Sequence, residues 1–234
     1  MTTITIENPF VSEFGALIAT ALGCDHELAV AIGRSARPRE HLSHGIIIDS
    51  ESEEQHVHLL AHGHARLIAS SMDGRMVVIE DYPAGELLGL TGLFGWDGVP
   101  AQVCAVVPSR TGAFGAPEFV KLMSTHGAVA LGVSRMLIRR LAAANRRVAE
   151  NATLSAPGRI HAELMRRARD GQVSEGKALA IRPIPVWSEL ALALQTTRET
   201  VSRAVSALEK RGILKRDGDA LVIVAPHRLE ELIY

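Results

Sequence analysis

Residues 184–224 constrain the fold more than any other stretch, because two short helical patterns are followed directly by a strand–turn–strand pattern. At about 100° per residue, the second helical pattern separates polar and apolar side chains onto opposite faces. The apolar face carries Val201, Ala204, Val205 and Leu208, and the polar face carries Arg198, Glu199, Ser202 and Arg203. This order of elements predicts a winged helix-turn-helix, whose polar helix face can enter a major groove of DNA.

The same segment allows plainer interpretations. Thr196 and Glu199 have the spacing of a capping box, in which the Glu199 side chain bonds a backbone N–H group instead of a base. Arg198 and Arg203 could be solvated surface charges. Gln195, in the turn between the helical patterns, is tolerated there if its backbone stays right-handed. In the strand–turn–strand pattern, an Asp-Gly turn at residues 217–218 predicts the hairpin of a wing.

Charge divides the chain into two unlike parts. Residues 1–138 hold 8 Lys and Arg against 15 Asp and Glu, a net −7, whereas residues 139–234 hold 17 against 11, a net +6. A basic carboxyl-terminal part suits a polyanionic partner, and its arginines suit bidentate contacts with phosphate and guanine. A chance imbalance of charge is the alternative.

Cysteine usage and hydropathy exclude several classes of protein. Cys24 and Cys104 are the two cysteines of the chain, too few for a Cys-rich zinc finger or an all-cysteine iron–sulfur cluster within one chain. There is no sign of a disulfide scaffold, so a cytoplasmic location is expected. No signal-peptide pattern and no apolar run approaching 18 residues is present, so we expect no membrane span.

The rest of the chain alternates between helical and strand-like character. Residues 10–34 look helical, and between residues 40 and 120 short apolar or alternating runs are separated by turn signals. Such runs are typical of a β-sandwich or jelly-roll barrel. Residues 117–153 then return to a long helical pattern. Ser155 is expected to cap a further helix that begins near Arg159.

The long helical pattern contains a candidate dimerisation seam. Leu137, Leu141, Ala144 and Val148 recur at spacings of four, three and four, flanked by arginines 139, 140, 146 and 147. This spacing is that of a coiled coil about two heptads long, which favours a homodimer. Packing of the same side chains against the chain's own barrel is the alternative.

From about residue 35 to residue 226 the chain resembles the Crp–Fnr family of bacterial transcription regulators. The most specific segments are PAGELLGLTGLF, residues 83–94, and TTRETVSRAVSALEKRGIL, residues 196–214. The resemblance implies an α+β architecture with a cyclic-nucleotide-binding-like β-barrel or jelly-roll sensor over residues 1–127. A long connecting and dimerisation helix over residues 128–154 and a winged helix-turn-helix over residues 155–234 would follow. It also implies double-stranded DNA, a second copy of the chain and RNA polymerase as partners, and a regulator rather than an enzyme.

The resemblance assigns roles to residues of the second helical pattern. In the family, this segment reads half of a palindromic TGTGA-like site. Arg198 would bond O6 and N7 of a guanine, Glu199 would accept from a cytosine amino group, and Arg203 would contact another base-pair edge. Further DNA contacts are expected from Thr197, Thr200, Ser202 and Lys215.

The sensor departs from the family where a cyclic nucleotide would bind. Leu90 stands in place of the Glu that contacts the ribose, and Pro100 and Ala101 stand in place of the Arg and Ser or Thr that hold the cyclic phosphate. A buried phosphate without a cation is poorly compensated, so the usual binding of cyclic AMP is not expected. A cyclic dinucleotide, another anion or no effector remain open, with Arg135, Arg139 or Arg140 as substitute cations. The predicted effector pocket comprises Gly89, Leu90, Thr91, Pro100, Ala101, Arg140 and Asn145.

Four histidines, His56, His58, His62 and His64, are crowded into QHVHLLAHGHARL. In a hairpin that turns near Gly63, His56 and His58 share one face, and His62 and His64 flank the turn and could approach them. Such a group could bind zinc, nickel or haem iron or respond to pH, and exposed strand-edge histidines are the alternative. A metal-dependent cupin enzyme fused to a DNA-binding tail is the corresponding second function. We assign no metal and no cofactor from the sequence.

Overall fold

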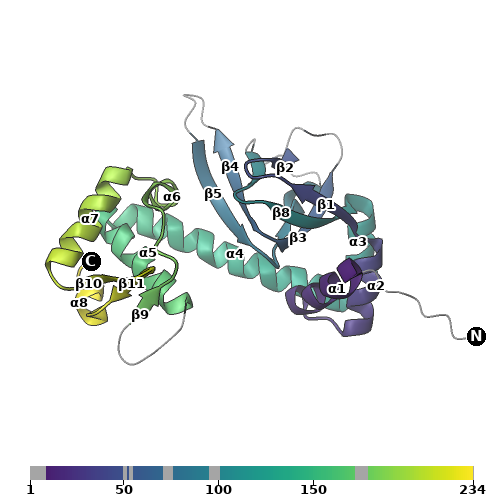
Figure 1. Ribbon diagram of the computed structural model, residues 1–234. Helices are drawn as coiled ribbons and strands as arrows, with labels where there is room; N and C mark the ends of the chain where they lie inside the picture. Colours follow the sequence, from purple (N-terminus) through teal and green to yellow (C-terminus); the bar gives the residue numbers. More distant parts are fainter. Residues whose placement is uncertain are drawn as a thin grey trace, which may run out of the picture. The chain divides into compact units, whose positions relative to one another are not determined.

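The computed structural model describes residues 9–49, 52, 55–70, 76–94, 101–171 and 179–233 (Figure 1). The chain divides into two compact units, Met1–Leu141 and Ala142–Tyr234. The boundary falls inside helix α4 (Gly127–Thr153), which therefore contributes to both units. In the described part, no single helix is long and apolar enough to cross a membrane, and one bent pair reaches that threshold by length and composition only.

The first unit is a β-sandwich with helices, as the sequence predicts. Its sheets have strand orders β1-β8-β3-β6 and β2-β7-β4-β5, and the paired strands are antiparallel. The strands are β1 (Arg37–His41), β2 (Ile46–Asp49), β3 (His56–His62), β4 (His64–Ser70), β5 (Met76–Pro83), β6 (Leu87–Leu88), β7 (Ala101–Ala105) and β8 (Ser109–Gly115). The helices are α1 (Pro9–Leu22), α2 (His26–Ser35), the 3-10 helix η1 (Leu90–Phe94), α3 (Ala116–Thr125) and the first part of α4.

Alternation along β3 separates two apolar clusters. Leu60 faces the space between the two sheets, where it joins Tyr82 of β5 and Val103 of β7. Val57 and Leu59 belong to a second cluster with residues of α1, α2, α3 and α4, so these helices cover the outer face of the first sheet. The sheet that contains β3 is therefore covered on both faces at this strand. Successive residues of β3 face alternately the second sheet and the helices.

Two predicted helical stretches are each broken once. Residues 10–34 form α1 and α2, which are separated at Gly23 with a φ of 65° and bent by 116°. Residues 117–153 form most of α3 and α4, separated at His126. The breaks allow all four helices to place apolar side chains in the same cluster on the sheet. Packing onto one sheet has overridden the local helical pattern.

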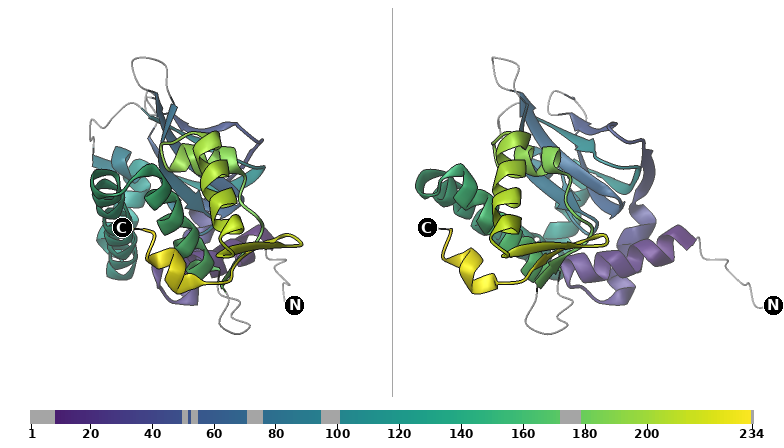
Figure 2. Two further views of the ribbon diagram at one scale, coloured as in Figure 1. Left: turned by 90° about the vertical axis from the view of Figure 1, so that its left-hand side faces the viewer. Right: turned by 60° about the vertical axis from the view of Figure 1, so that its left-hand side comes forward.

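The second unit is a winged helix-turn-helix (Figure 2). It contains α5 (Ala156–Asp170), β9 (Leu179–Ile181), α6 (Trp187–Ala193), α7 (Arg198–Lys210), β10 (Leu214–Asp217), β11 (Ala220–Ile223) and α8 (Pro226–Glu230). The three strands form one antiparallel sheet of order β10-β11-β9. Ser155 caps α5 as predicted, because its hydroxyl accepts a hydrogen bond from the Gly158 N–H at 3.2 Å, but the helix begins at Ala156 rather than near Arg159.

Candidate DNA-reading surface and effector region

Helix α7 has the two faces that its periodicity predicts. Val201, Val205 and Leu208 are buried in a core that also contains residues of α5, α6 and β11. Arg198, Glu199, Ser202 and Arg203 are exposed on the opposite face. The Glu199 carboxylate accepts a hydrogen bond from the Arg203 guanidinium one turn further on. The base contacts assigned to these side chains remain predictions, for which the exposed face is a necessary condition.

The alternative interpretation of Thr196 and Glu199 as a capping box is wrong, because the capping residue is the next one along the chain. The N-cap of α7 is Thr197, whose hydroxyl accepts from the Thr200 backbone N–H at 3.1 Å and lies 2.8 Å from the Thr200 hydroxyl. Thr197 caps the helix, and the Glu199 side chain bonds Arg203 rather than a backbone N–H group. Thr197 and Thr200 lie together at the first turn, where hydroxyl groups suit phosphate contacts.

Gln195 has a left-handed backbone, so the right-handed conformation on which its tolerance was predicated is not the one it adopts. Its φ is 51°, and it follows the C-cap residue Leu194 of α6. The Gln195 N–H donates to the Leu192 carbonyl at 3.3 Å, and the Thr196 N–H donates to the Ala191 carbonyl at 2.9 Å. These two bonds form a Schellman motif, which requires the left-handed conformation at this position. The turn of the helix-turn-helix is thus fixed by backbone hydrogen bonds that its composition does not reveal.

The wing is the hairpin β10–β11, and its turn differs from the predicted one. Asp217 pairs with Ala220, so the two central residues are Gly218 and Asp219 rather than Asp217 and Gly218. Gly218 has a φ of 59°, which a glycine at the first central position adopts without strain. The wing exposes Lys215 at its start, as a phosphate contact requires.

Arg216, next to Lys215, holds the wing against the helices. Its Nε donates to Glu209 Oε1 of α7 at 2.7 Å, and its guanidinium carbon lies 5.8 Å from the centre of the Trp187 ring of α6. Trp187 itself packs against the core. Arg216 is therefore committed to these contacts, and Lys215 is the better candidate for DNA.

The predicted seam of α4 is exposed in the single chain. Leu137, Leu141 and Val148 are 46%, 61% and 69% exposed, and Ala144 is half-buried. Packing of the seam against the chain's own barrel is therefore wrong for the three larger side chains. The barrel is contacted by another face of the helix, which carries Val129, Val133 and Met136. Leu131 and Ile138 are also exposed, so the apolar surface is wider than predicted.

The effector region lies where β6 leads into η1. Gly89 has a φ of 81°, and a Cβ atom there would lie 2.4 Å from the His56 carbonyl oxygen, so only glycine fits. Leu90 packs against the helix-covered apolar cluster. Thr91 is exposed, Ala101 begins β7 and is half-buried, and Asn145 is exposed on α4. The prediction for Pro100 lies outside the described residues.

Arg140 is engaged within the first unit, which argues against its use as a substitute cation for a ligand. Its guanidinium bonds Glu86 at 2.6 Å and the Leu87 carbonyl, lies 3.3 Å from Glu80, and covers the Tyr82 ring at 4.8 Å. The Tyr82 hydroxyl donates to Glu80 at 2.9 Å, and burial together with Glu80 raises the pKa of that hydroxyl. Two carboxylates thus neutralise the Arg140 charge and attach α4 to β5 and β6.

The histidines do not gather as a hairpin would require. The chain crosses at Gly63 from one sheet to the other, since β3 pairs with β8 and β6 whereas β4 pairs with β5 and β7. His64 therefore points to Asp81, with its Nε2 3.1 Å from the carboxylate, and His62 lies at a separate pocket. The described residues contain no group of three His, Cys, Asp or Glu side chains that could hold a metal ion. They provide no ligand set for the cupin alternative.

His58 is buried, so the interpretation as exposed histidines is wrong for this residue. Its Nδ1 and the Nε2 of His41 each lie 3.0 Å from the hydroxyl of fully buried Thr111. The rings of His41 and His56 are both centred 6.1 Å from the His58 ring. Burial lowers the pKa of His58 to about 4, with further lowering from His41, His56 and Arg39. No local pattern could associate His41 with His58, because β8 lies between their two strands.

This histidine predicts a pH dependence of stability. His58 has a pKa near 6.5 in the unfolded chain and about 4 in the folded one, so the unfolded state binds more protons between these values. We expect the His58 contribution to be complete above about pH 6.5 and to fall by on the order of 2–3 kcal/mol as pH drops through 4. The measurement is urea unfolding against pH for the wild type and His58→Gln, with exposed His26→Gln as control. If the free energy of unfolding changed with pH in the same way for the wild type and His58→Gln, a neutral buried imidazole at His58 would be contradicted.

Comparison with known proteins supports both units. A cyclic nucleotide-binding domain model matches residues 39–126, and a Crp-like helix-turn-helix domain model matches residues 158–232. The chain is 20% identical over 186 residues to a CRP-like cAMP-activated global transcriptional regulator of Mycobacterium tuberculosis, covering 80% of this chain and 83% of that one. It is 27% identical over 180 residues to the cyclic AMP receptor protein of Thermus thermophilus, covering 77% and 80%.

Solved structures show the same fold. A CooA mutant from Carboxydothermus hydrogenoformans superposes with a TM-score of 0.78 at 18% identity, over 93% of this chain and 95% of that one. The order of β-sandwich, long helix and winged helix-turn-helix agrees with both domain matches. The chain belongs to the Crp–Fnr family of transcription regulators, with a cyclic nucleotide-binding-type domain followed by a Crp-like helix-turn-helix domain.

Proposed function

We propose that this regulator binds DNA as a homodimer and reads each half of a palindromic, TGTGA-like site with α7. The observation that carries the proposal is the exposed first turns of α7, where Arg198, Glu199 and Arg203 project from a helix whose other face is buried. A guanidinium matches the two acceptors of guanine, and a carboxylate matches the amino group of cytosine. Thr197, Thr200, Ser202 and Lys215 supply the contacts that set the position of α7 on the duplex.

A second copy of the chain is the partner that best fits the α4 seam. Its exposed leucines and valine repeat at coiled-coil spacing, and two such helices would bury them against each other. A two-fold axis through this seam would match the symmetry of a palindromic site. RNA polymerase as a further partner follows from the family resemblance, and the cytoplasm as the compartment follows from the lack of a disulfide pattern.

We further propose that the β-domain does not bind cyclic AMP in the usual way. The relatives from Mycobacterium tuberculosis and Thermus thermophilus are named for cyclic AMP, but this chain has Leu90 where the family places a carboxylate for the ribose. Leu90 contributes only apolar surface, and Arg140 already pairs with Glu80 and Glu86. The protein would respond to a different effector or bind DNA without one.

One selection experiment tests these statements together. Random duplexes are selected with the full-length protein in the presence of cyclic AMP, cyclic GMP, cyclic di-GMP or no ligand. We expect a symmetric site to emerge without a requirement for cyclic AMP. Absence of any preferred sequence would contradict DNA reading by α7, whereas strict dependence on cyclic AMP would contradict only the statement about the pocket.

Substitution of Arg198 tests the reading helix directly. Arg198→Ala should cost roughly 1–3 kcal/mol at the selected site and relax preference at one base pair, because a bidentate contact to guanine is lost. Binding is measured by fluorescence anisotropy on the selected site and on single-base variants. Arg228→Ala removes an exposed arginine of α8 and serves as the matched control.

Lys215→Ala provides the contrasting result. Loss of a phosphate contact should weaken binding to all duplexes equally. The slope of the logarithm of the binding constant against the logarithm of salt concentration should fall by about one released counterion. If Arg198→Ala left both affinity and base preference unchanged, the proposed docking of α7 would be wrong.

A further inference from the structure

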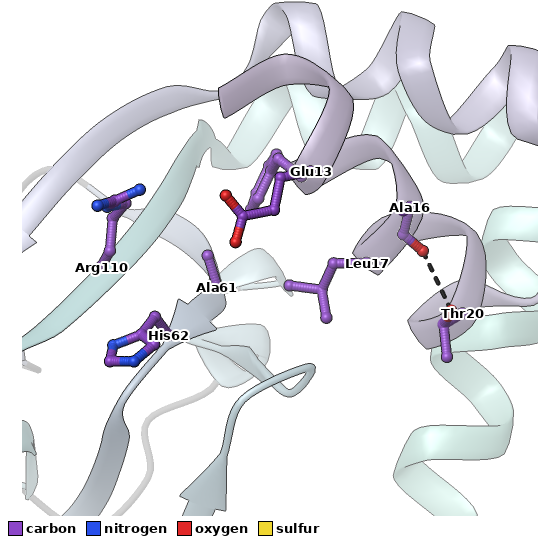
Figure 3. Close-up of a pocket in the computed structure, with 8 residues that line it drawn as sticks. Glu13, Ala16, Leu17, Thr20, Ala61, His62 and Arg110 are labelled. Atoms are coloured by element: carbon purple, nitrogen blue, oxygen red, sulfur yellow. Dashed lines mark hydrogen bonds between the residues drawn. The ribbon is translucent and has the colours of Figure 1, made fainter. Parts of the chain in front are cut away.

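A cavity of about 330 Å³ lies between α1 and the strands β3 and β8 (Figure 3). Its size is at the lower end of the roughly 300–1,000 Å³ found for small-molecule sites. The predicted effector residues Gly89, Leu90, Thr91, Ala101 and Arg140 do not line it. The lining residues are Glu13, Phe14, Ala16, Leu17, Thr20, Ala61, His62 and Arg110.

Most of the lining is apolar. Phe14 is 1% exposed and belongs to the helix-covered core, and Leu17 and Ala61 pack against that core. The Thr20 hydroxyl donates to the Ala16 carbonyl at 3.1 Å, so a hydroxyl that could serve a ligand is already bonded within α1. This part of the cavity therefore suits a hydrocarbon group rather than a polar one.

Three polar side chains remain at the cavity, and they come from three different elements. Glu13 belongs to α1, His62 to β3 and Arg110 to β8, and each is exposed. Among the described residues, no ion pair or side-chain hydrogen bond joins any of the three. Figure 3 shows Arg110 and His62 at one side of the space, Leu17 at the other, and the Glu13 carboxylate directed between them. From one side of the cavity to the other, the lining thus presents a cation, a carboxylate and an apolar surface.

We propose that this cavity binds an α-amino acid with an apolar side chain. The ligand carboxylate pairs with the Arg110 guanidinium, which matches it in a bidentate manner, and His62 lies beside it. The ligand ammonium pairs with Glu13, and the apolar side chain lies against Leu17, Ala61 and Phe14. An α-amino acid carries its ammonium and its carboxylate on the same carbon atom, so one small molecule can pair with both the arginine and the glutamate. The binding site is separate from the DNA-reading helix and does not depend on the proposed DNA site.

Titration calorimetry of the full-length protein tests the proposal with L-leucine and L-phenylalanine. Each truncated analogue of leucine lacks one proposed contact: 4-methylpentanoate lacks the ammonium, 3-methylbutylamine lacks the carboxylate, and glycine lacks the apolar group. We expect saturable binding of at least one of the two amino acids at millimolar concentration or below. Each analogue should bind about tenfold more weakly or not measurably, because a charge-assisted contact or the apolar contact is lost.

Variants of the lining residues separate the proposed contacts. Arg110→Ala and Glu13→Gln should each weaken amino-acid binding about tenfold. Ala16→Phe should abolish it, since Ala16 is exposed on α1 and the larger side chain fills the cavity without disturbing the core. Arg37→Ala, an exposed arginine on β1 that does not line the cavity, should leave binding unchanged.

Three results would overturn the proposal. These are absence of saturable binding of either amino acid, equal binding of glycine, and binding that survives both Arg110→Ala and Ala16→Phe. Circular dichroism spectra of the variants establish that each retains the fold. DNA binding by the same variants without amino acid reports on the proposed function separately.

Discussion

A protein with glutamate at both Leu137 and Leu141 is expected to be a monomer with no preference for a two-fold symmetric DNA site. In the proposed dimer, four carboxylates would meet along the α4 seam, and each buried, unpaired charge costs several kcal/mol. The dimerisation constant should therefore fall about a thousandfold, equivalent to about 4 kcal/mol, or more. Each protomer should still fold, because the two leucines are 46% and 61% exposed in the single chain.

Sedimentation equilibrium and DNA titration measure this effect. The matched control carries glutamate at Ala142 and Ala149, which are exposed on α4 and lie about 100° around the helix from the seam. This control has the same added charge and should remain a dimer. A Leu137→Glu, Leu141→Glu protein that stays dimeric with unchanged affinity for the palindrome would show that the interface lies elsewhere.

Arg140→Ala is expected to destabilise the first unit by about 3–5 kcal/mol. The Arg140 side chain is 16% exposed and its partners Glu86 and Glu80 are 21% and 24% exposed, so its removal leaves two mostly buried carboxylates without their cation. Breaking a buried ion pair on one side is costly, because the remaining charges keep their desolvation penalty. Loss of the contact with the Leu87 carbonyl should also loosen α4 from β6.

Hydrogen exchange and urea unfolding together measure this loss. Protection should fall in residues 76–94 and 127–141 and stay unchanged in the winged helix-turn-helix, which has its own core. Arg139→Ala is the control: its side chain is 64% exposed and 3.7 Å from Glu86, so it should cost less than about 1 kcal/mol. If Arg140→Ala were as mild as Arg139→Ala, the network would not hold α4 to the sheet. Addition of Glu80→Gln and Glu86→Gln should restore part of the stability.

The DNA-reading helix is the feature that the sequence predicts most completely. Helical periodicity places Val201, Val205 and Leu208 on one face, and the structure buries all three. The polar face and the hairpin after it follow from equally local patterns. The hairpin turn was misplaced by one position, and the capping residue is Thr197 rather than the Thr196 of the alternative interpretation. Several adjacent residues can serve in each role, and the choice depends on how the whole turn is hydrogen-bonded.

Contacts between distant segments could not be predicted. Arg140 and Glu86 are separated by 54 positions. The sequence therefore offered Arg140 as a cation for a ligand, whereas the structure pairs it with Glu86 and Glu80. The rings of His41 and His58 both contact the hydroxyl of Thr111. Thr111 belongs to β8, which lies far along the chain from both histidines. The apparent hairpin at Gly63 joins two different sheets, which separates histidines that are neighbours in sequence.

Local sequence patterns were therefore enough to predict the architecture, the two faces of α7 and the repeat of apolar residues along the α4 seam. These features can be predicted from the periodicity of apolar residues, because each depends on how side chains repeat along a single helix or strand. The engagement of Arg140, the burial of His58, the exposure of the α4 seam and the cavity beside α1 became apparent from the three-dimensional packing. Each of these depends on which elements pack together, and pairing between elements is set by the burial of whole faces rather than by any local pattern.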